Sequence, residues 1–123
     1  MIDTFASMHG VALTRAAEQT VAGGISIASL ATNSIVQGNF IGTDRSGSAD
    51  LGNAGFGISV ATASNLIGGT TPGAGNVIAF SSADNVQLTD IATDVSILGN
   101  SIFFSGSGIG DIGIDLGLDG VTS

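Results

Sequence analysis

The sequence predicts an all-β protein in which short parallel strands stack into a coil, with about three and a half coils and three strands per coil. Three observations support this prediction. A four-residue piece recurs, as GNFI at 38–41, GNVI at 75–78 and GNSI at 99–102. The apolar residues lie in short segments bounded by Gly, Asn, Ser or Thr, which is typical of strands. The chain also lacks Trp and Tyr, and small aliphatic side chains suit a narrow core.

Residues 1–23 do not match the repeat. Residues 14–19, TRAAEQ, are good helix formers and Thr14 is a suitable N-cap, so a short helix that covers the end of the coil is expected. The alternative is a loosely ordered leader, because terminal residues are ordered only where something holds them. The chain therefore divides into an N-terminal segment, 1–23, and a repeat domain, 24–123.

The first strand of each coil is the clearest part of the repeat. GISI, GISV, NVQL and GIDL start at residues 24, 57, 85 and 113, with spacings of 33, 28 and 28. Successive side chains of a strand point to opposite faces. The apolar members should therefore face inward, namely Ile25, Ile27, Ile58, Val60, Val86, Leu88, Ile114 and Leu116. The intervening residues should face outward, namely Ser26, Ser59, Gln87 and Asp115.

Asparagine marks the places where one strand should turn into the next. A second strand follows Asn33, Asn65 and Asp94, so that Asp94 takes the place of Asn33 in the third coil. Asn tolerates left-handed backbone and can hydrogen-bond to the layers above and below. A structural role at the corners is therefore expected for Asn33, Asn39, Asn76 and Asn100.

Two coils contain an insertion. The first has a polar loop at 42–54, GTDRSGSADLGNA, and the second has GTTPGA at 69–74. Insertions in repeat proteins gather on one face and often form the working surface. Both loops are therefore candidate binding surfaces.

The charge and composition of the chain restrict its partners. There is no Lys, Arg15 and Arg45 are the strong bases, and the net charge is −8. Nucleic acids and anionic membranes are recognised by clusters of basic side chains, so neither is expected as a partner. No apolar stretch is long enough to span a bilayer, and no secretory signal is present. The chain is expected either to stay inside the cell or to be part of a longer secreted protein.

The repeat resembles a known family. The string N-x-I-x-G-N-x-I-G-T-D at 33–44, with L-G-N and G-I-x-V at 51–60, IGGT at 67–70 and GAGNVIA at 73–79, is similar to right-handed parallel β-helix repeat proteins of the pectate-lyase-like superfamily. More narrowly, it resembles the repetitive bacterial proteins of this type that are secreted or lie at the cell surface. The resemblance implies a right-handed coil and an extracellular or cell-surface location.

The chain also departs from the enzymes of that superfamily. They normally have more coils and a groove rich in Asp, Arg, Lys or His, whereas this chain has few coils and no Lys. The paired Asp, Gly-His-Gly and Arg-Ile-Lys motifs of polygalacturonases are absent. No catalytic residue is therefore carried over from the resemblance.

The insertion at 42–54 holds the first candidate site. Asp44 and Asp50 flank Arg45, so the carboxylates could act as general acid and base or hold a hard cation, and Arg45 could pair with an anionic sugar. The alternative is a solvated turn, because Thr-Asp followed by Ser-Gly is ordinary turn chemistry.

Asp111, Asp115 and Asp119 form a second candidate site, for calcium. They are spaced by four residues in GDIGIDLGLDG, and calcium binds six to eight oxygen ligands. The alternative is a polar outer face on the last coil that keeps the array from growing. No other cofactor is expected.

A hydrolase site and a sugar platform are the remaining candidates. Ser7 and His9, with Asp3 nearby, formally allow a Ser-His-Asp arrangement, although triads are defined in space and not in sequence. Phe103–Phe104 is a candidate exposed aromatic pair for stacking on a sugar, and alternation should turn one of the two rings inward.

The sequence favours a non-enzymatic structural or adhesive module that self-associates through the ends of its coil. A short solenoid exposes sheet edges, and exposed edges pair with other strands. The first alternative is an enzyme or binding protein for an acidic polysaccharide, with Asp44, Arg45 and Asp50 as its site. The second alternative is a hydrolase that uses Ser7 and His9.

Overall fold

The computed structural model describes residues 6–8, 11–13, 23–28, 30–106, 108 and 111–117, and the regular secondary structure of these residues is entirely β-strand. The all-β prediction is therefore confirmed for the described chain. The short helix expected at 14–19 lies outside the described residues. Within the described segments, no helix is long and apolar enough to cross a membrane.

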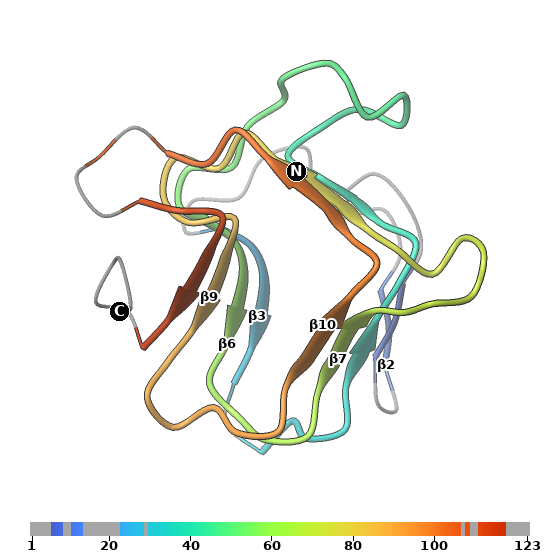
Figure 1. Ribbon diagram of the computed structural model, residues 1–123, viewed down its shortest axis with the longest axis vertical. Helices are drawn as coiled ribbons and strands as arrows, with labels where there is room; N and C mark the ends of the chain where they lie inside the picture. Colours follow the sequence, from blue (N-terminus) through green and yellow to red (C-terminus); the bar gives the residue numbers. More distant parts are fainter. Residues whose placement is uncertain are drawn as a thin grey trace.

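From residue 23 onward the strands form three parallel sheets, and each coil adds one strand to each sheet (Figure 1). The first coil consists of β3 (Gly23–Ile27), β4 (Ile35–Val36) and β5 (Phe40–Ile41), and the second of β6 (Phe56–Val60), β7 (Leu66–Gly68) and β8 (Val77–Ala79). The third coil consists of β9 (Val86–Leu88), β10 (Ser96–Leu98) and β11 (Ser101–Phe103). The strand β12 (Ile114–Leu116) follows. The sheet orders are β12-β9-β6-β3, β10-β7-β4 and β11-β8-β5. The prediction of three strands per coil is confirmed, and the arrangement is consistent with a β-helix-like solenoid.

An antiparallel hairpin precedes the first coil. β1 (Ala6–Met8) pairs with β2 (Val11–Leu13), with Ala6 opposite Leu13. β1 lies beside β4, on the outside of the coil (Figure 1). This hairpin is hard to predict from the amino-acid sequence, because only Gly10 marks a turn between two very short strands.

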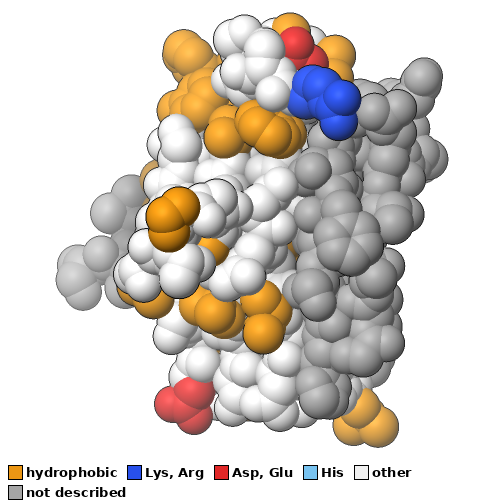
Figure 2. Space-filling model, turned by 90° about the vertical axis from the view of Figure 1, so that its right-hand side faces the viewer, with side chains coloured by type: hydrophobic (Ala, Val, Ile, Leu, Met, Phe, Trp, Pro, Cys, Tyr) orange, Lys and Arg blue, Asp and Glu red, His pale blue; other side chains and the backbone are white. Residues whose placement is uncertain are grey.

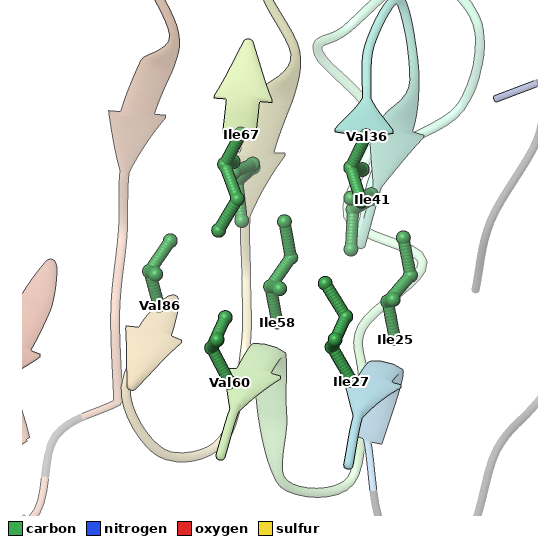
Figure 3. Close-up of a cluster of buried hydrophobic side chains, with 9 residues drawn as sticks. Ile25, Ile27, Val36, Ile41, Ile58, Val60, Ile67 and Val86 are labelled. Carbon is green, nitrogen blue, oxygen red and sulfur yellow. The ribbon is translucent and has the colours of Figure 1, made fainter. Parts of the chain in front are cut away.

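The core is built from columns of aliphatic side chains that repeat from coil to coil. Ile25, Ile58 and Val86 occupy one register position in β3, β6 and β9, and they are 4%, 0% and 0% exposed. Figure 3 shows these side chains pointing into the same interior as Val36 and Ile67 from the second sheet. Full burial of such a side chain stabilises the fold by about 1.5–3 kcal/mol. The inward prediction is confirmed for these positions.

The outward positions of the first sheet are only partly exposed. Ser26 is exposed, whereas Ser59 and Asp115, which alternation also turns away from the core, are buried, at 8% and 3% exposure. Gln87, one coil away, donates its Nε2–H to Ser59 Oγ at 2.9 Å. A side chain that faces away from the core can still be covered by other parts of the chain, and alternation alone does not reveal this.

One corner of the coil carries an asparagine ladder, formed by Asn39, Asn76 and Asn100. The backbone N–H of Asn39 donates to Asn76 Oδ1 at 3.0 Å, and that of Asn76 donates to Asn100 Oδ1 at 2.9 Å. Their side-chain amides donate to the same oxygens, at 3.1 and 2.8 Å. The predicted structural role is confirmed for these three residues, and the corner between the second and third sheets is called the ladder corner below.

Asn33 has a different role. It lies at the corner between the first and second sheets with a φ of 56°, and the equivalent residues of the next coils, Ser64 and Asp94, have φ values of 61° and 51°. The expected equivalence of Asn33 and Asp94 is confirmed. Asn65 lies one position later, where its Oδ1 accepts the backbone N–H of Ser34 at 2.9 Å. The alignment of Asn65 with Asn33 is therefore wrong by one residue. In the second coil Ser64 has the left-handed backbone, and the asparagine comes directly after it.

Candidate functional site

Asp44 is held inside its own loop. Its carboxylate accepts the Ser46 hydroxyl at 2.7 and 2.9 Å and the backbone N–H groups of Ser48 and Ala49 at 3.3 and 3.1 Å. The Ser46 hydrogen bond, followed by that from Ala49, holds the pKa of Asp44 below its ordinary value. A carboxylate with these partners stabilises a turn, so the structure supports the turn interpretation and does not present Asp44 as a general base.

Arg45 and Asp50 are both exposed, at different points of the same loop. Asp50 lies opposite Thr43 in an isolated antiparallel bridge that closes the loop. No ion pair joins Arg45 to a carboxylate among the described residues. Figure 2 shows a face with few charged side chains among its described residues, where the cationic side chain and an acidic one lie beside apolar side chains at the top of the view. The three predicted residues thus lie on one loop, and their joint action as an acid–base or cation site remains a prediction.

The loop is one layer of a larger feature, the variable corner between the third and first sheets. Residues 42–55 and 80–85 turn this corner in the first two coils, with different lengths, and residues 104–106 and 111–113 belong to the corner of the third coil. Backbone hydrogen bonds join the layers: Ser82 N–H donates to Asn53 at 3.0 Å, Phe80 N–H to Phe104 at 2.8 Å and Gly106 N–H to Ala83 at 2.9 Å. Segments far apart in sequence are therefore held side by side at this corner.

Three phenylalanines gather at the variable corner. The rings of Phe80 and Phe104 are stacked, with centroids 5.2 Å apart and planes 14° from parallel. Phe103 packs edge-on against both, at 5.8 and 5.6 Å. Phe103 is half-buried and Phe104 is 69% exposed, while Ile102 is the residue of this strand that packs on the core. Phe80 was missed because it lies one coil away in sequence.

A groove runs beside the stacked rings. It has a volume of about 360 Å³ and is lined by Asp50, Phe80, Ser81, Ser82, Phe104, Ser105 and Gly106. A smaller hollow of about 250 Å³ shares Ser82 and continues toward Leu51 and Ala54. The surface formed by Asp50, Phe80, Ser82, Phe104 and Ser105 is called the corner groove below. It combines an apolar ring face with hydroxyls and one carboxylate.

A second hollow lies at the last coil. It has a volume of about 430 Å³, and its lining residues are Leu88, Thr89, Asp90, Ala92, Thr93, Asp94, Val95, Leu116 and Gly117. These residues belong to β9, β12 and the turn after β9. The hollow therefore marks the end of the coil at which β12 is the last described strand, and this end is called the tail below.

The calcium candidates are only partly described by the structure. Asp111 accepts the backbone N–H of Gly108 at 2.6 Å, Asp115 is buried in β12, and Asp119 lies outside the described residues. No group of three acidic, His or Cys side chains among the described residues could hold a metal ion. Calcium binding by the three aspartates remains a prediction that the structure does not test.

The hydrolase candidates are also untested. Ser7 belongs to β1, but its side chain and the whole of His9 lie outside the described part of the chain. The Ser7–His9 hypothesis therefore remains a prediction from sequence.

Similarity to known proteins gives no further guidance. Comparisons with protein-family models, with curated proteins and with solved structures found no match.

Proposed function

We propose that the chain is a right-handed parallel β-helix that serves as a non-enzymatic structural or adhesive module of a bacterial surface or secreted protein, and that it self-associates through an end of its coil. The observation that carries the proposal is the exposure of apolar side chains in β12, the last strand that the structure describes. The parallel sheets and the repeat support the β-helix, and its hand and location rest on the family resemblance.

The opening of the tail is visible along each inward column. The column Ile25, Ile58 and Val86 is at most 4% exposed until it reaches Ile114, which is 38% exposed. The neighbouring column behaves in the same way, because Val60 is 0% exposed and Leu116 is 52% exposed. The aliphatic interior of the coil therefore meets solvent at the tail.

The strand edges of the tail reinforce this. Among the described residues, β10 and β11 are the last strands of their sheets at this end. The edge of a sheet pairs readily with another strand, because its backbone groups can extend the ladder. Exposed apolar side chains beside such edges favour association over a solitary monomer.

Light scattering across a concentration series tests the proposal, with Leu116→Asp as the disrupting variant. A charge in the exposed column should weaken association at least about tenfold, since 1.4 kcal/mol corresponds to a factor of ten. Leu30→Asp is the matched control, because Leu30 is 94% exposed in the first coil, far along the chain from the tail. A protein that stays monomeric at the highest concentration would refute self-association.

A second candidate function, carbohydrate binding, is favoured by the corner groove. Stacked rings with neighbouring hydroxyls suit a sugar ring, which has an apolar face and polar edges. The carboxylate of Asp50 and the net charge of −8 would repel an acidic sugar, so a neutral or amine-bearing saccharide fits better than the acidic polysaccharide considered from sequence. The groove has one carboxylate among its described residues, which supports binding more than turnover.

Titration with neutral, amine-bearing and uronic-acid oligosaccharides tests this candidate. Phe104→Ala should weaken binding about tenfold, because it removes the exposed ring of the stack. Leu98→Ala is the control, since Leu98 is 45% exposed on β10 and lies outside the groove. Equal binding by wild type and Phe104→Ala, or no binding by any of the three sugar classes, would remove the corner groove as a site.

A further inference from the structure

We infer that the corner groove binds a quaternary ammonium group, in which carbon substituents surround a permanent positive charge. This role goes beyond the proposed function, because the recognised group is a cation and neither a sugar ring nor a second copy of the chain. The stacked rings of Phe80 and Phe104 would contact the cation, and the carboxylate of Asp50 would balance its charge.

The two rings belong to one column of the variable corner. The parallel bridge between Asn53 and Ser81 aligns the residues just before them, Gly52 and Phe80. The register of β11 on β8 aligns Phe104 with Phe80 in the same way. All three members of the column have left-handed backbone, with φ values of 62°, 57° and 47° in chain order. The column therefore carries a ring in the second and third coils but no side chain in the first.

The carboxylate of Asp50 lies in the layer where the column has no ring. A Cβ added to Gly52 would lie 3.6 Å from Asp50 Oδ1 and 3.8 Å from the carbonyl oxygen of Phe80. Asp50 and the two rings line the same groove of about 360 Å³, and Arg45 is not among its lining residues. The groove therefore combines aromatic surface with negative charge, without a base among its described lining residues.

Aromatic surface beside one carboxylate suits a cation that has no N–H groups. The face of a phenylalanine ring attracts positive charge through its quadrupole. A primary ammonium has three donors that need acceptors once water is removed, whereas a quaternary ammonium has none and packs its methyl groups on the rings. Phe104 is 69% exposed, so its ring is accessible from solvent. The net charge of −8 attracts cations over a longer range.

NMR titration with tetramethylammonium chloride and with choline tests the inference, followed through the amide shifts of Ser82, Ser105 and Gly106. The control ligand is dimethylbutanol, the uncharged carbon analogue of choline, which should bind at least about tenfold more weakly. Methylammonium should also bind more weakly than tetramethylammonium. Phosphocholine separates a phosphorylated head group from free choline, and it should be the weaker ligand because the negatively charged protein repels its phosphate.

Three variants assign the binding to the groove. Asp50→Asn removes the charge and keeps the shape of the side chain, and Phe104→Leu keeps an apolar side chain and removes the ring. Each should weaken choline binding about tenfold. Asp94→Asn is the matched control, because it removes one exposed carboxylate outside the groove and asparagine tolerates the left-handed φ of 51° at this position. It should bind choline as the wild type does.

Equal binding of choline and dimethylbutanol would overturn the inference. So would unchanged binding by Asp50→Asn or Phe104→Leu, or an equally large loss in Asp94→Asn, once circular dichroism has shown each variant to be folded. Choline binding by a protein that stays monomeric would support the cation site and refute self-association, whereas self-association without choline binding would do the reverse. Binding of a neutral sugar but not of tetramethylammonium would overturn the cation site and support the carbohydrate candidate.

Discussion

The ladder corner and the variable corner lie on the same coils but differ in what they do. At the ladder corner each coil places the same residue at the same step, and Asn39, Asn76 and Asn100 bond to one another through backbone and side chain. At the variable corner the turns differ in length and carry Asp50, Phe80 and Phe104 on the surface.

The difference shows how a repeat can keep its geometry and still vary its surface. A corner that supplies interlayer hydrogen bonds cannot change without leaving buried groups unpaired. A corner held mainly by backbone contacts between layers tolerates turns of other lengths and other side chains. Insertions in solenoid proteins are generally found at such positions. Function is therefore more readily carried by the variable corner and by the coil end than by the ladder corner.

The largest effect is predicted for Asn76→Ala at the ladder corner. Asn76 Oδ1 accepts two hydrogen bonds from Asn39, and its Nδ2 donates to Val36 O at 2.9 Å and to Asn100 Oδ1 at 2.8 Å. Removing the amide leaves several buried partners unsatisfied, and the free energy of unfolding should fall by about 3–5 kcal/mol. Denaturant unfolding measures it. Asn33→Gly is the control and should stay within about 0.5 kcal/mol, because Asn33 is exposed with a left-handed φ that glycine also adopts. Similar losses in both variants would contradict the special role of the ladder.

A smaller loss is predicted for Gly42→Ala at the variable corner. Gly42 has a φ of 83°, and a Cβ there would overlap the carbonyl oxygen of Ala79. Strain and overlap together should lower the free energy of unfolding by about 3 kcal/mol. Gly73→Ala separates the two causes, because Gly73 has a φ of 82° but a Cβ added to it would meet no atom within 4 Å. It should lose about 1 kcal/mol, from backbone strain alone. Equal losses of unfolding free energy in the two variants would show that the backbone of the variable corner shifts to relieve the overlap.

Phe104→Ala should cost about 1 kcal/mol. The stack on Phe80 and the edge contact with Phe103 are lost, but Phe104 is 69% exposed and its left-handed φ of 47° is strained for an aromatic residue. Thermal or denaturant unfolding measures the change. A loss as large as that of Asn76→Ala would mean that the rings are structural and would weaken the contrast between the corners.

The smallest effect concerns Asp44 and should be confined to its loop. Because hydrogen bonds lower the pKa of Asp44 in the folded protein, its stabilisation is present above the ordinary carboxyl range, near pH 4, and is lost as the pH falls through the lowered pKa. An NMR titration of the carboxyl group, together with the amide shifts of Ser48 and Ala49, measures it. Ser46→Ala should raise the pKa toward its ordinary value, since the Ser46 hydroxyl is the largest cause of the shift. An unchanged titration in Ser46→Ala would refute that cause.

The stacked strands could be predicted because their determinants are local and repeated. The alternation of Ile58 and Val60 marked the inner face, and the GN-x-I pieces marked the steps of Asn39, Asn76 and Asn100. A period that holds over several coils allows each one to support the others. Where the period is ambiguous by one residue, as at Ser64 and Asn65, the same reasoning failed.

The surface features could not be predicted in the same way, because they depend on which coils lie next to each other at one corner. In sequence, Asp44 looks like a free carboxylate, and only the folded loop brings Ser46, Ser48 and Ala49 around it. Phe80 gains its importance from Phe104, which lies in the next coil. The exposure of Leu116 likewise follows from the position of its coil in the stack, since its alternation is the same as that of Val60.

The asparagine ladder has a consequence for how such a molecule can change its length. Every hydrogen bond of the ladder runs in the same direction, from a backbone N–H of one coil to the Oδ1 of the next. Each coil therefore offers the same donor and the same acceptor to its neighbours. A duplicated unit of 28 residues, the spacing from 57 to 85 and from 85 to 113, would continue the pattern and lengthen the coil by about 4.8 Å. Gain or loss of a single residue within a strand would move its apolar side chains to the wrong face, whereas the variable corner accepts turns of different length. The coil can therefore grow along its axis only by whole repeat units, each of which adds one strand to every sheet.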